Sequence, residues 1–316
     1  MARSNIPNVF REEAMNNASL DSLLRGQIAI VCHDAGSANI IISWLKKMPD
    51  VSVKAHLEGP AAALWAKAFP ESPTFSFADV FYDCSMLISG TGWASDLEHN
   101  ARVRASSEGM RSIAVIDHWV NYKERFIRKE YVQLPDHICV TDKYAYNLVQ
   151  KIFPEVQVSL MPNSYLDEQV KAINLLTNST SAFTNAENIL YVLEPIRVPW
   201  DGGASLPGEF QALDYFVSST EKITSANSNI KIRPHPSDSE GKYKAWVERQ
   251  IIQIDISEGC TLFEDIAWSS IVVGCQSYAM VVALAAKKRV ICSLPPFAPE
   301  LALPYAEIEQ IRSLRR

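Results

Sequence analysis

Residues 26–48 read GQIAIVCHDAGSANIIISWLKKM, and the order of apolar, small and polar residues in them indicates the class of fold. It begins with a continuous apolar run, passes through small and polar residues, and ends in a segment with the composition of a helix. An apolar run without alternation is typical of a strand that is buried on both faces, as in a parallel sheet. The stretch therefore predicts a strand, a short turn and a helix that covers the sheet.

The same pattern returns in both halves of the chain. Further strand signals lie in residues 51–59, 84–92, 111–119, 137–141, 188–195, 229–234, 269–275 and 289–294. Helical segments lie between most of these strands, and such regular alternation calls for a mostly parallel sheet covered on both faces. The sequence therefore predicts an α/β fold of two Rossmann-like domains whose parallel sheets face a cleft.

A polar stretch rich in Ser, Thr and Asn separates the two halves. The expected N-terminal domain spans residues 1–171, the linker residues 172–187 and the C-terminal domain residues 188–316. A chain of 316 residues has room for a separate core in each half. A polar hinge between the halves fits closure over a ligand.

Composition narrows the class of protein. A net charge of −6 argues against nucleic acid as the main partner. The six cysteines are scattered without a C-x-x-C pair, and the N-terminus lacks the apolar segment of a signal peptide, so we expect a reduced, cytoplasmic protein. No apolar run reaches membrane-spanning length, and the basic end at 308–316 allows at most a peripheral membrane contact. The oligomeric state is not indicated.

Residues 231–238 read KIRPHPSD and contain the end of a predicted strand at Pro234. Each proline fixes its own φ and pushes the preceding residue into extended backbone, so Arg233 and His235 lie on a stiff segment just past the strand. An imidazole titrates near neutrality and can donate a proton or a charge-assisted hydrogen bond to a departing phosphate. The alternative is a histidine that only packs in a proline-rich turn.

The last strand–helix unit, residues 268–296, has a buried strand that ends at Gly274 and an apolar helix that begins near Ser277. The first-turn amides and the dipole of a helix attract anions, and a serine hydroxyl there can donate to a phosphate. Gly274 would allow a ligand to approach the backbone closely. The structural alternative is that Ser277 is an N-cap and Gly274 a tight turn. Because His235 follows an earlier strand of the same predicted sheet, both strand ends are expected to face one cleft.

This combination resembles the nucleotide-binding domain of GT-B-type glycosyltransferases. The R-P-H-P strand end, followed by strand–Gly–x–x–Ser–helix, is similar to the HP motif of bacterial transferases that use CMP-sialic acid or related nonulosonates, and to arrangements in capsule and CDP-glycerol-type transferases. In the sialyltransferases the motif's histidine lies at the donor phosphate, which a downstream serine-rich motif also binds. The resemblance covers residues 188–296 and implies that His235 is the phosphate contact or general acid. It implies that Ser269, Ser270 and Ser277 are candidates for the serine part. The other donor-binding candidates, from their places in these two segments, are Arg233, Pro236 and Gly274.

The resemblance also implies that the N-terminal half holds the glycan acceptor and the catalytic base. Small and polar residues follow three predicted strands there, where ligands of open α/β sheets bind. An inverting transfer needs a carboxylate that takes the proton of the acceptor hydroxyl. Asp34 and Asp117 are the best-placed carboxylates; neither matches a base motif, and each can instead be a helix N-cap. The other candidates at these strand ends are His33, Gly36, Gly90, Thr91, Gly92 and His118, with Trp93 and Trp119 as side chains that can stack on a sugar.

Other chemistries lack their sequence patterns. The sequence has no D-x-D motif and no paired histidines at helical spacing, which would indicate a metal site. It also lacks the G-x-G-x-x-G motif of dinucleotide binding, the Walker A motif of ATP binding and the G-x-S-x-G motif of serine hydrolases. We therefore expect a metal-independent inverting glycosyltransferase without a cofactor. It would move a sugar, such as a sialic-acid-like nonulosonate from a CMP donor, onto a glycan. Two alternatives stay open: a GT-B-fold epimerase of the UDP-GlcNAc 2-epimerase type, and a two-lobed small-molecule-binding protein without catalysis.

Overall fold

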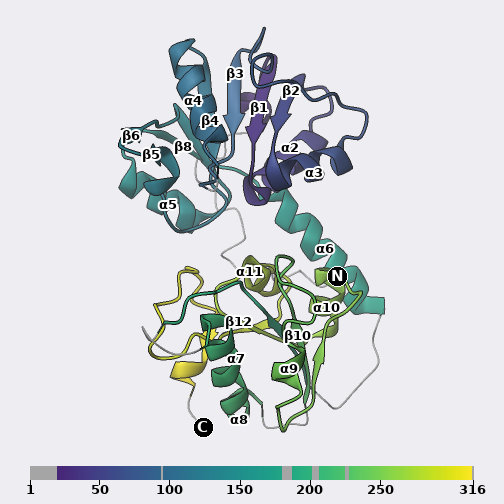
Figure 1. Ribbon diagram of the computed structural model, residues 1–316. Helices are drawn as coiled ribbons and strands as arrows, with labels where there is room; N and C mark the ends of the chain where they lie inside the picture. Colours follow the sequence, from purple (N-terminus) through teal and green to yellow (C-terminus); the bar gives the residue numbers. More distant parts are fainter. Residues whose placement is uncertain (1–19, 94, 180–186, 201–205, 225–227, 315–316) are drawn as a thin grey trace, which may run out of the picture. The chain divides into compact units, whose positions relative to one another are not determined.

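The computed structural model describes residues 20–93, 95–179, 187–200, 206–224 and 228–314. Contacts divide the chain into two compact units, one that ends at Tyr165 and one that begins at Leu166. Each unit contains one six-stranded sheet (Figure 1). All strand pairs within these two sheets are parallel. The expected α/β fold with two Rossmann-like domains is confirmed.

The sheet of the N-terminal unit has the strand order β2-β1-β3-β4-β7-β8. Its strands are β1 (Ile28–Cys32), β2 (Val53–Leu57), β3 (Met86–Ser89), β4 (Arg111–Val115), β7 (His137–Val140) and β8 (Gln157–Leu160). The helices of this unit are α1 (Leu20–Leu23), α2 (Ala35–Lys46), α3 (Gly59–Ala68), α4 (Leu97–Ser107), η2 (Glu124–Phe126) and α5 (Lys143–Ile152). A two-stranded hairpin follows η2 and consists of β5 (Ile127–Arg128) and β6 (Tyr131–Val132).

Alternate residues of β1 explain why helices cover both faces of this sheet. Ile28 and Ile30 belong to a core with residues of α2 and α3, while Ala29 and Val31 belong to a core with residues of α4. A strand buried on both faces reads as a continuous apolar run, as the sequence shows. The chain passes from β1 to β2 and then returns to β3 on the other side of β1. Ligands of open α/β sheets bind at such a switch point.

The sheet of the C-terminal unit has the order β11-β10-β9-β12-β13-β14 and a switch point between β9 and β12. Its strands are β9 (Glu187–Val192), β10 (Ser228–Arg233), β11 (Ile254–Ile256), β12 (Ile271–Gly274), β13 (Arg289–Cys292) and β14 (Glu309–Gln310). Its helices are α7 (Gly208–Ser218), α8 (Thr220–Ile223), α9 (Lys244–Val247), α10 (Leu262–Trp268), α11 (Tyr278–Ala285) and η3 (Ile311–Ser313).

The linker expected at residues 172–187 is in part helical. Residues 172–179 belong to α6 (Ser164–Ser179), where the buried side chains of Leu166 and Ile173 are seven residues apart and so share one face. Residues 180–186 lie outside the described residues. The domain boundaries at 171 and 188 stay a prediction.

Two findings bear on the expectations from composition. All six cysteines are free, and four of them, Cys32, Cys139, Cys275 and Cys292, are buried as small apolar side chains. Within the described ranges, none of the helices combines the length and the apolar character needed to cross a membrane.

Candidate functional site

The carboxyl ends of β1 and β3 bring together the residues predicted there. His33 Nδ1 and Asp34 Oδ1 lie 2.8 Å apart, and since an ionised carboxylate can only accept, His33 donates. A β carbon on Gly92 would lie 2.1 Å from Asp34 Oδ2, so glycine leaves room for this carboxylate. The side chains of His33 and Asp34 are 21% and 31% exposed and therefore remain accessible to a ligand.

Asp117 follows β4, the strand next to β3. Its Oδ1 accepts a hydrogen bond from Arg125 Nη1 at 3.2 Å and a weaker one from Ser37 Oγ at 3.5 Å. Arg125 Nη1 also donates to Thr91 Oγ1 at 3.2 Å. A β carbon on Gly36 would lie 1.7 Å from Asp117 Oδ2. Asp117 is thus engaged in an ion pair with Arg125 that links the segments after β3 and β4. Among the residues that the structure describes, Asp34 has no Lys or Arg partner of this kind.

Two buried charged residues, Glu98 and Arg102, lie behind these loops and were not expected from the sequence. Glu98 Oε1 accepts from the His33 amide at 3.0 Å, and Oε2 accepts from the Gly92 amide at 2.5 Å. Burial raises the pKa of Glu98. Arg102 Nη1 donates to the Gly90 carbonyl at 3.0 Å, and burial lowers the pKa of Arg102 to about 10. Arg102 is therefore still charged at neutral pH.

The helical pattern of α4 could not reveal this burial. Leu97, Ala101 and Ala105 recur every four residues and mark the apolar stripe that packs on the sheet. Glu98 and Arg102 lie directly beside that stripe, and charged residues in such positions are usually solvent-exposed. Their burial follows from the strand-end loops that cover them, which only the tertiary structure shows.

The remaining N-terminal candidates play different parts. His118 Nδ1 accepts from the Trp119 amide at 2.9 Å, and burial lowers the pKa of His118. Trp119 is 8% exposed and its Nε1 donates to Asp142 Oδ2 at 2.9 Å, so it is a core residue. Trp93, by contrast, is 59% exposed and follows Gly92 directly. Trp93 is thus the one of these two tryptophans that is accessible to a sugar.

In the C-terminal unit, the register places three strand ends level with one another. Val192 of β9 pairs with Arg233 of β10 on one side and with Gly274 of β12 on the other. Neighbouring strands are about 4.8 Å apart, so the segments that follow β10, β9 and β12 leave one sheet edge over a width of about 10 Å. His235, Glu194 and the start of α11 lie on these three segments.

His235 is held in one orientation by the turn that follows it. Its Nδ1 accepts from the Ser237 amide at 3.1 Å, and its own amide donates to Asp238 Oδ2 at 2.9 Å. Since Nδ1 is an acceptor, the neutral ring carries its proton on Nε2. Burial lowers the pKa of His235, although the charge of Asp238 opposes this. At neutral pH the residue therefore presents an Nε2–H donor.

A buried ion-pair network supports this turn. Asp238 Oδ1 accepts from Arg197 Nη2 at 2.7 Å and from Lys242 Nζ at 3.0 Å, and both cations also contact the buried carboxylate of Glu209. Burial alone would raise the pKa of Asp238, but hydrogen bonds from Lys242, Arg197 and Tyr243 outweigh it and lower the pKa to about 2. The turn that carries the imidazole is consequently fixed by charges that persist at neutral pH.

The helix expected to bind phosphate already holds a carboxylate of this chain. Glu194, two residues after β9, accepts from the Gln276 amide at 2.5 Å and from the Ser277 amide. Ser277 is the N-cap of α11, and its Oγ accepts from the Ala279 amide at 3.2 Å. Burial raises the pKa of Glu194 to about 6. Glu194 was not among the site residues predicted from the sequence, although a carboxylate near the end of a predicted strand was a usable signal.

Other predicted donor residues lie elsewhere. Arg233 Nη1 donates to the buried Asp265, the Cys260 carbonyl and Ser257, so its guanidinium is already engaged by this chain. Ser269 and Ser270 precede β12, while Ser277 follows it, so the three serines do not form one site.

Gly274 and Pro236 complete the list of predicted donor residues. A β carbon on Gly274 would meet Val192 and Met280 at 2.9–3.1 Å, so packing within the unit requires this glycine. Pro236 is exposed beside His235.

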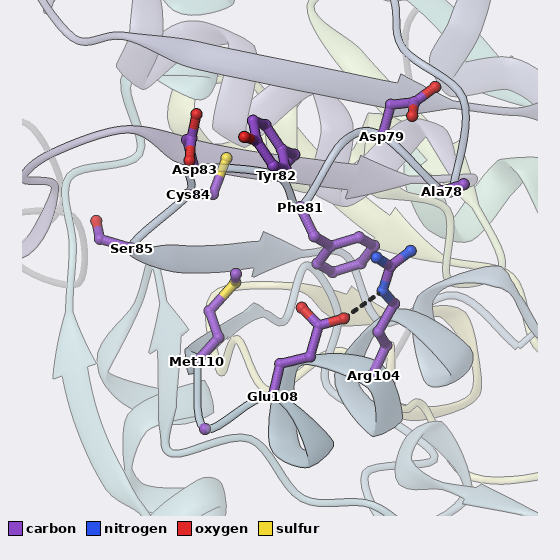
Figure 2. Close-up of a pocket in the computed structure, with 11 residues that line it drawn as sticks. Ala78, Asp79, Phe81, Tyr82, Asp83, Cys84, Ser85, Arg104, Glu108 and Met110 are labelled. Carbon is purple, nitrogen blue, oxygen red and sulfur yellow. Dashed lines mark hydrogen bonds and ion pairs between the residues drawn. The ribbon is translucent and has the colours of Figure 1, made fainter.

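The N-terminal unit has a surface pocket of about 560 Å³, and the residues that line it include Asp79, Tyr82, Arg104 and Glu108 (Figure 2). Ser85 and Met110, which also line it, directly precede β3 and β4, so the pocket lies at the amino ends of these strands. It is thus separate from the residues at the carboxyl ends. Across the described ranges, no group of three or more His, Cys, Asp or Glu side chains is arranged to hold a metal ion.

No family model matches the sequence, and no curated protein matches it. The fold is similar to the UDP-GlcNAc 2-epimerase of Methanocaldococcus jannaschii, with a TM-score of 0.56, 10% identity, and 84% of this chain and 83% of that chain covered. The Neisseria meningitidis UDP-GlcNAc 2-epimerase, solved with UDP-GlcNAc bound, is similar with a TM-score of 0.56 and 10% identity, and the match covers 84% of this chain and 82% of that chain. A putative UDP-N-acetylglucosamine 2-epimerase of Listeria monocytogenes is similar with a TM-score of 0.54 and 12% identity, and the match covers 84% of this chain and 78% of that chain.

At these identities the similarity establishes the fold alone. The chain has a GT-B-like fold of two Rossmann-like domains, as the sequence analysis expected. The resemblance to nonulosonate transferases stays a prediction.

Proposed function

We propose that this protein is a metal-independent glycosyltransferase that takes its sugar from a nucleotide donor. The observation that carries the proposal is His235: a fixed imidazole with an Nε2–H donor at the carboxyl edge of a parallel sheet. The C-terminal unit would bind the donor nucleotide there. The N-terminal unit would bind the glycan acceptor and supply the base.

In the proposed inverting reaction, an acceptor hydroxyl attacks the anomeric carbon of the donor sugar. Asp34 takes the hydroxyl proton as the new C–O bond forms, and the bond from the anomeric carbon to the phosphate oxygen breaks. His235 Nε2–H donates to that oxygen and so stabilises the leaving phosphate. Asp34 is preferred over Asp117 because Asp117 is engaged with Arg125, whereas Asp34 contacts a histidine that orients it.

The donor class rests on the HP motif. Its resemblance to transferases that use CMP-sialic acid supports a CMP-linked nonulosonate as the donor sugar. CMP and UDP donors differ in the number of phosphates as well as in the base. A comparison of nucleotides with one and two phosphates therefore tests the donor class.

Epimerisation of a nucleotide sugar is the second candidate function. The similarity in fold to two UDP-GlcNAc 2-epimerases and to a putative one supports it. His33, Asp117 and His118 also lie at strand ends, where they could transfer a proton to or from a sugar. An epimerase acts without an acceptor and must break a C–H bond of its substrate. A transferase leaves that bond intact.

One experiment separates these functions. The protein is incubated in D₂O with CMP-sialic acid or UDP-GlcNAc, with and without a mixture of oligosaccharides, and the products are followed by NMR. Release of the nucleotide together with a new glycosidic signal, and no deuterium in the sugar, supports the transferase. Deuterium at carbon 2 of UDP-GlcNAc without added oligosaccharide supports the epimerase. Binding of a nucleotide sugar without either product would favour a non-catalytic binding protein.

A further inference from the structure

Glu98 is a fully buried carboxylate that the proposed reaction does not use. It lies in the first turn of α4, and removal of a charged group from water is costly unless hydrogen bonds replace the water. Both oxygens have such bonds, from the His33 amide at 3.0 Å and the Gly92 amide at 2.5 Å. Because its side chain is inaccessible to a ligand, Glu98 does not exchange a proton with the substrate.

The two amides belong to the two loops that surround the candidate base. His33 contributes the imidazole that bonds Asp34 Oδ1, and Gly92 is the residue against which Asp34 Oδ2 lies. The first loop follows β1 and the second follows β3, so Glu98 joins them across the switch point of the sheet. A single carboxylate thereby fixes both sides of Asp34.

The two glycines of the G-T-G segment fit this arrangement. A β carbon on Gly90 would lie 2.2 Å from Glu98 Oε1. A β carbon on Gly92 would lie 2.1 Å from Asp34 Oδ2 and 2.9 Å from Glu98 Oε2. A side chain at either position would displace a carboxylate. Close packing of Asp34 and Glu98 therefore accounts for both glycines.

We propose that Glu98 is a positioning residue that holds the His33–Asp34 pair for proton transfer. The inference rests on the proposed function for its chemistry, while the geometry stands by itself. A carboxylate is required because both partners are N–H donors. Glutamine would offer one acceptor oxygen and an NH₂ group that itself donates, so one buried amide would lose its acceptor.

The first test needs no substrate. Nitrogen-15 NMR of the full chain reports the protonation and hydrogen bonding of the His33 ring, and His33→Asn identifies its signal. We expect Glu98→Gln to shift the Nδ1 signal away from its hydrogen-bonded position. Gly92→Ala, which keeps the buried carboxylate but displaces Asp34, should do the same. Gly92→Ala shows that the signal responds to a displaced Asp34, and an unchanged His33 signal in Glu98→Gln overturns the inference.

Asp136→Asn is the matched control. Asp136 Oδ2 accepts from the amide and the hydroxyl of Ser112 at 2.7 and 2.9 Å, at the amino end of β4, away from His33. The substitution thus also removes a carboxylate from strand-end donors of the same sheet. It should leave the His33 signal unchanged. If it shifts that signal as Glu98→Gln does, the effect is general destabilisation and the inference is overturned.

The second readout is release of nucleotide from CMP-sialic acid and UDP-GlcNAc. A displaced base should lower kcat roughly 100-fold in Glu98→Gln and leave the donor KM unchanged, since the donor itself is bound as before. Asp136→Asn should keep its kcat even if its melting temperature falls. If the kcat of Glu98→Gln equals that of wild type, the inference is overturned. If wild type releases nucleotide from neither compound, the proposed function fails, and the NMR result still decides the position of the His33–Asp34 pair.

Discussion

Glu194 leads to a quantitative prediction about the pH dependence of donor binding. Its carboxylate holds the Gln276 and Ser277 amides, the two donors that a phosphate would use at α11. A phosphate at those amides would lie about 4 Å from the carboxylate, where two negative charges repel by about 4 kcal/mol at an effective dielectric constant of 20. Protonation of Glu194 avoids this repulsion. With a pKa of about 6, protonation costs about 1.4 kcal/mol at pH 7.

Protonation is the smaller cost, so donor binding should take up one proton. Above pH 6 each further pH unit adds about 1.4 kcal/mol to the free-energy cost of protonating Glu194. The Kd of the donor should therefore rise roughly tenfold between pH 7 and pH 8. His235 is already neutral in this range because burial lowers its pKa. Cys275 and Tyr191 beside Glu194 do not titrate there either, since burial raises the pKa of Cys275 to about 12 and that of Tyr191 well above its usual range.

Calorimetry with CMP-sialic acid and UDP-GlcNAc measures this directly, because the phosphates of these compounds do not titrate between pH 7 and 8. Glu194→Gln should bind more tightly at pH 8 and lose the pH dependence. A matched variant, Glu264→Gln, changes an exposed glutamate in the first turn of α10 and should show the same pH dependence of Kd as wild type. A Kd that is independent of pH in wild type, or weaker binding by Glu194→Gln, would show that the phosphate does not use these amides.

Three further predictions follow from single residues. Asp34→Asn should lower kcat by roughly 10²- to 10⁴-fold and leave donor affinity intact, and retained kcat in transfer assays would exclude Asp34 as the base. Gly274→Ala should destabilise the fold by about 1–3 kcal/mol in thermal unfolding, because the new β carbon would lie 2.9 Å from Val192 Cγ2; unchanged stability would contradict this packing. The native pKa of Asp238 is about 2, below its usual 3.8, so its ionic contribution to stability is present above about pH 4 and is lost as the pH falls towards 2. Asp238→Asn should reduce the loss of unfolding free energy between about pH 4 and pH 2, measured by denaturant unfolding at each pH. An unchanged loss would contradict the ion-pair network around Asp238.

The fold was predictable because its strands are buried on both faces. Continuous apolar runs such as that of β1, separated by helical segments, indicate parallel sheets without knowledge of any contact. Short elements at the margins, such as β11 and β14, were not expected. Between β10 and β11 the helix is limited to Lys244–Val247, and Gly241 precedes it with φ of 74°, a left-handed turn conformation.

The candidate site was predictable only where strand ends gather polar residues. The group around Asp34 and Asp117 was found because parallel strands all end at one edge of a sheet. Glu98 and Arg102 were missed because a helical pattern does not show which charged residues become buried. Arg233 was assigned to the phosphate because of its place in the motif, yet it pairs with Asp265, which belongs to a later helix. Long-range pairs of this kind are not visible in local sequence.

The central claim is that His235 contacts the phosphate of a nucleotide donor. A thermal-shift screen with CMP, CDP, UMP, UDP and GDP, on wild type, His235→Ala and Ser237→Ala, tests it most directly. We predict that CMP or CDP stabilises wild type. His235→Ala should weaken the affinity for that nucleotide by roughly 10- to 100-fold, the loss expected for a hydrogen bond to a charged group. Ser237→Ala removes the hydroxyl that lies 2.8 Å from His235 Nδ1 but keeps the backbone amide that donates to the same nitrogen at 3.1 Å. Because Nδ1 keeps one donor, this variant should bind almost as wild type does. The absence of stabilisation by any nucleotide, or equal stabilisation of His235→Ala, would contradict the account.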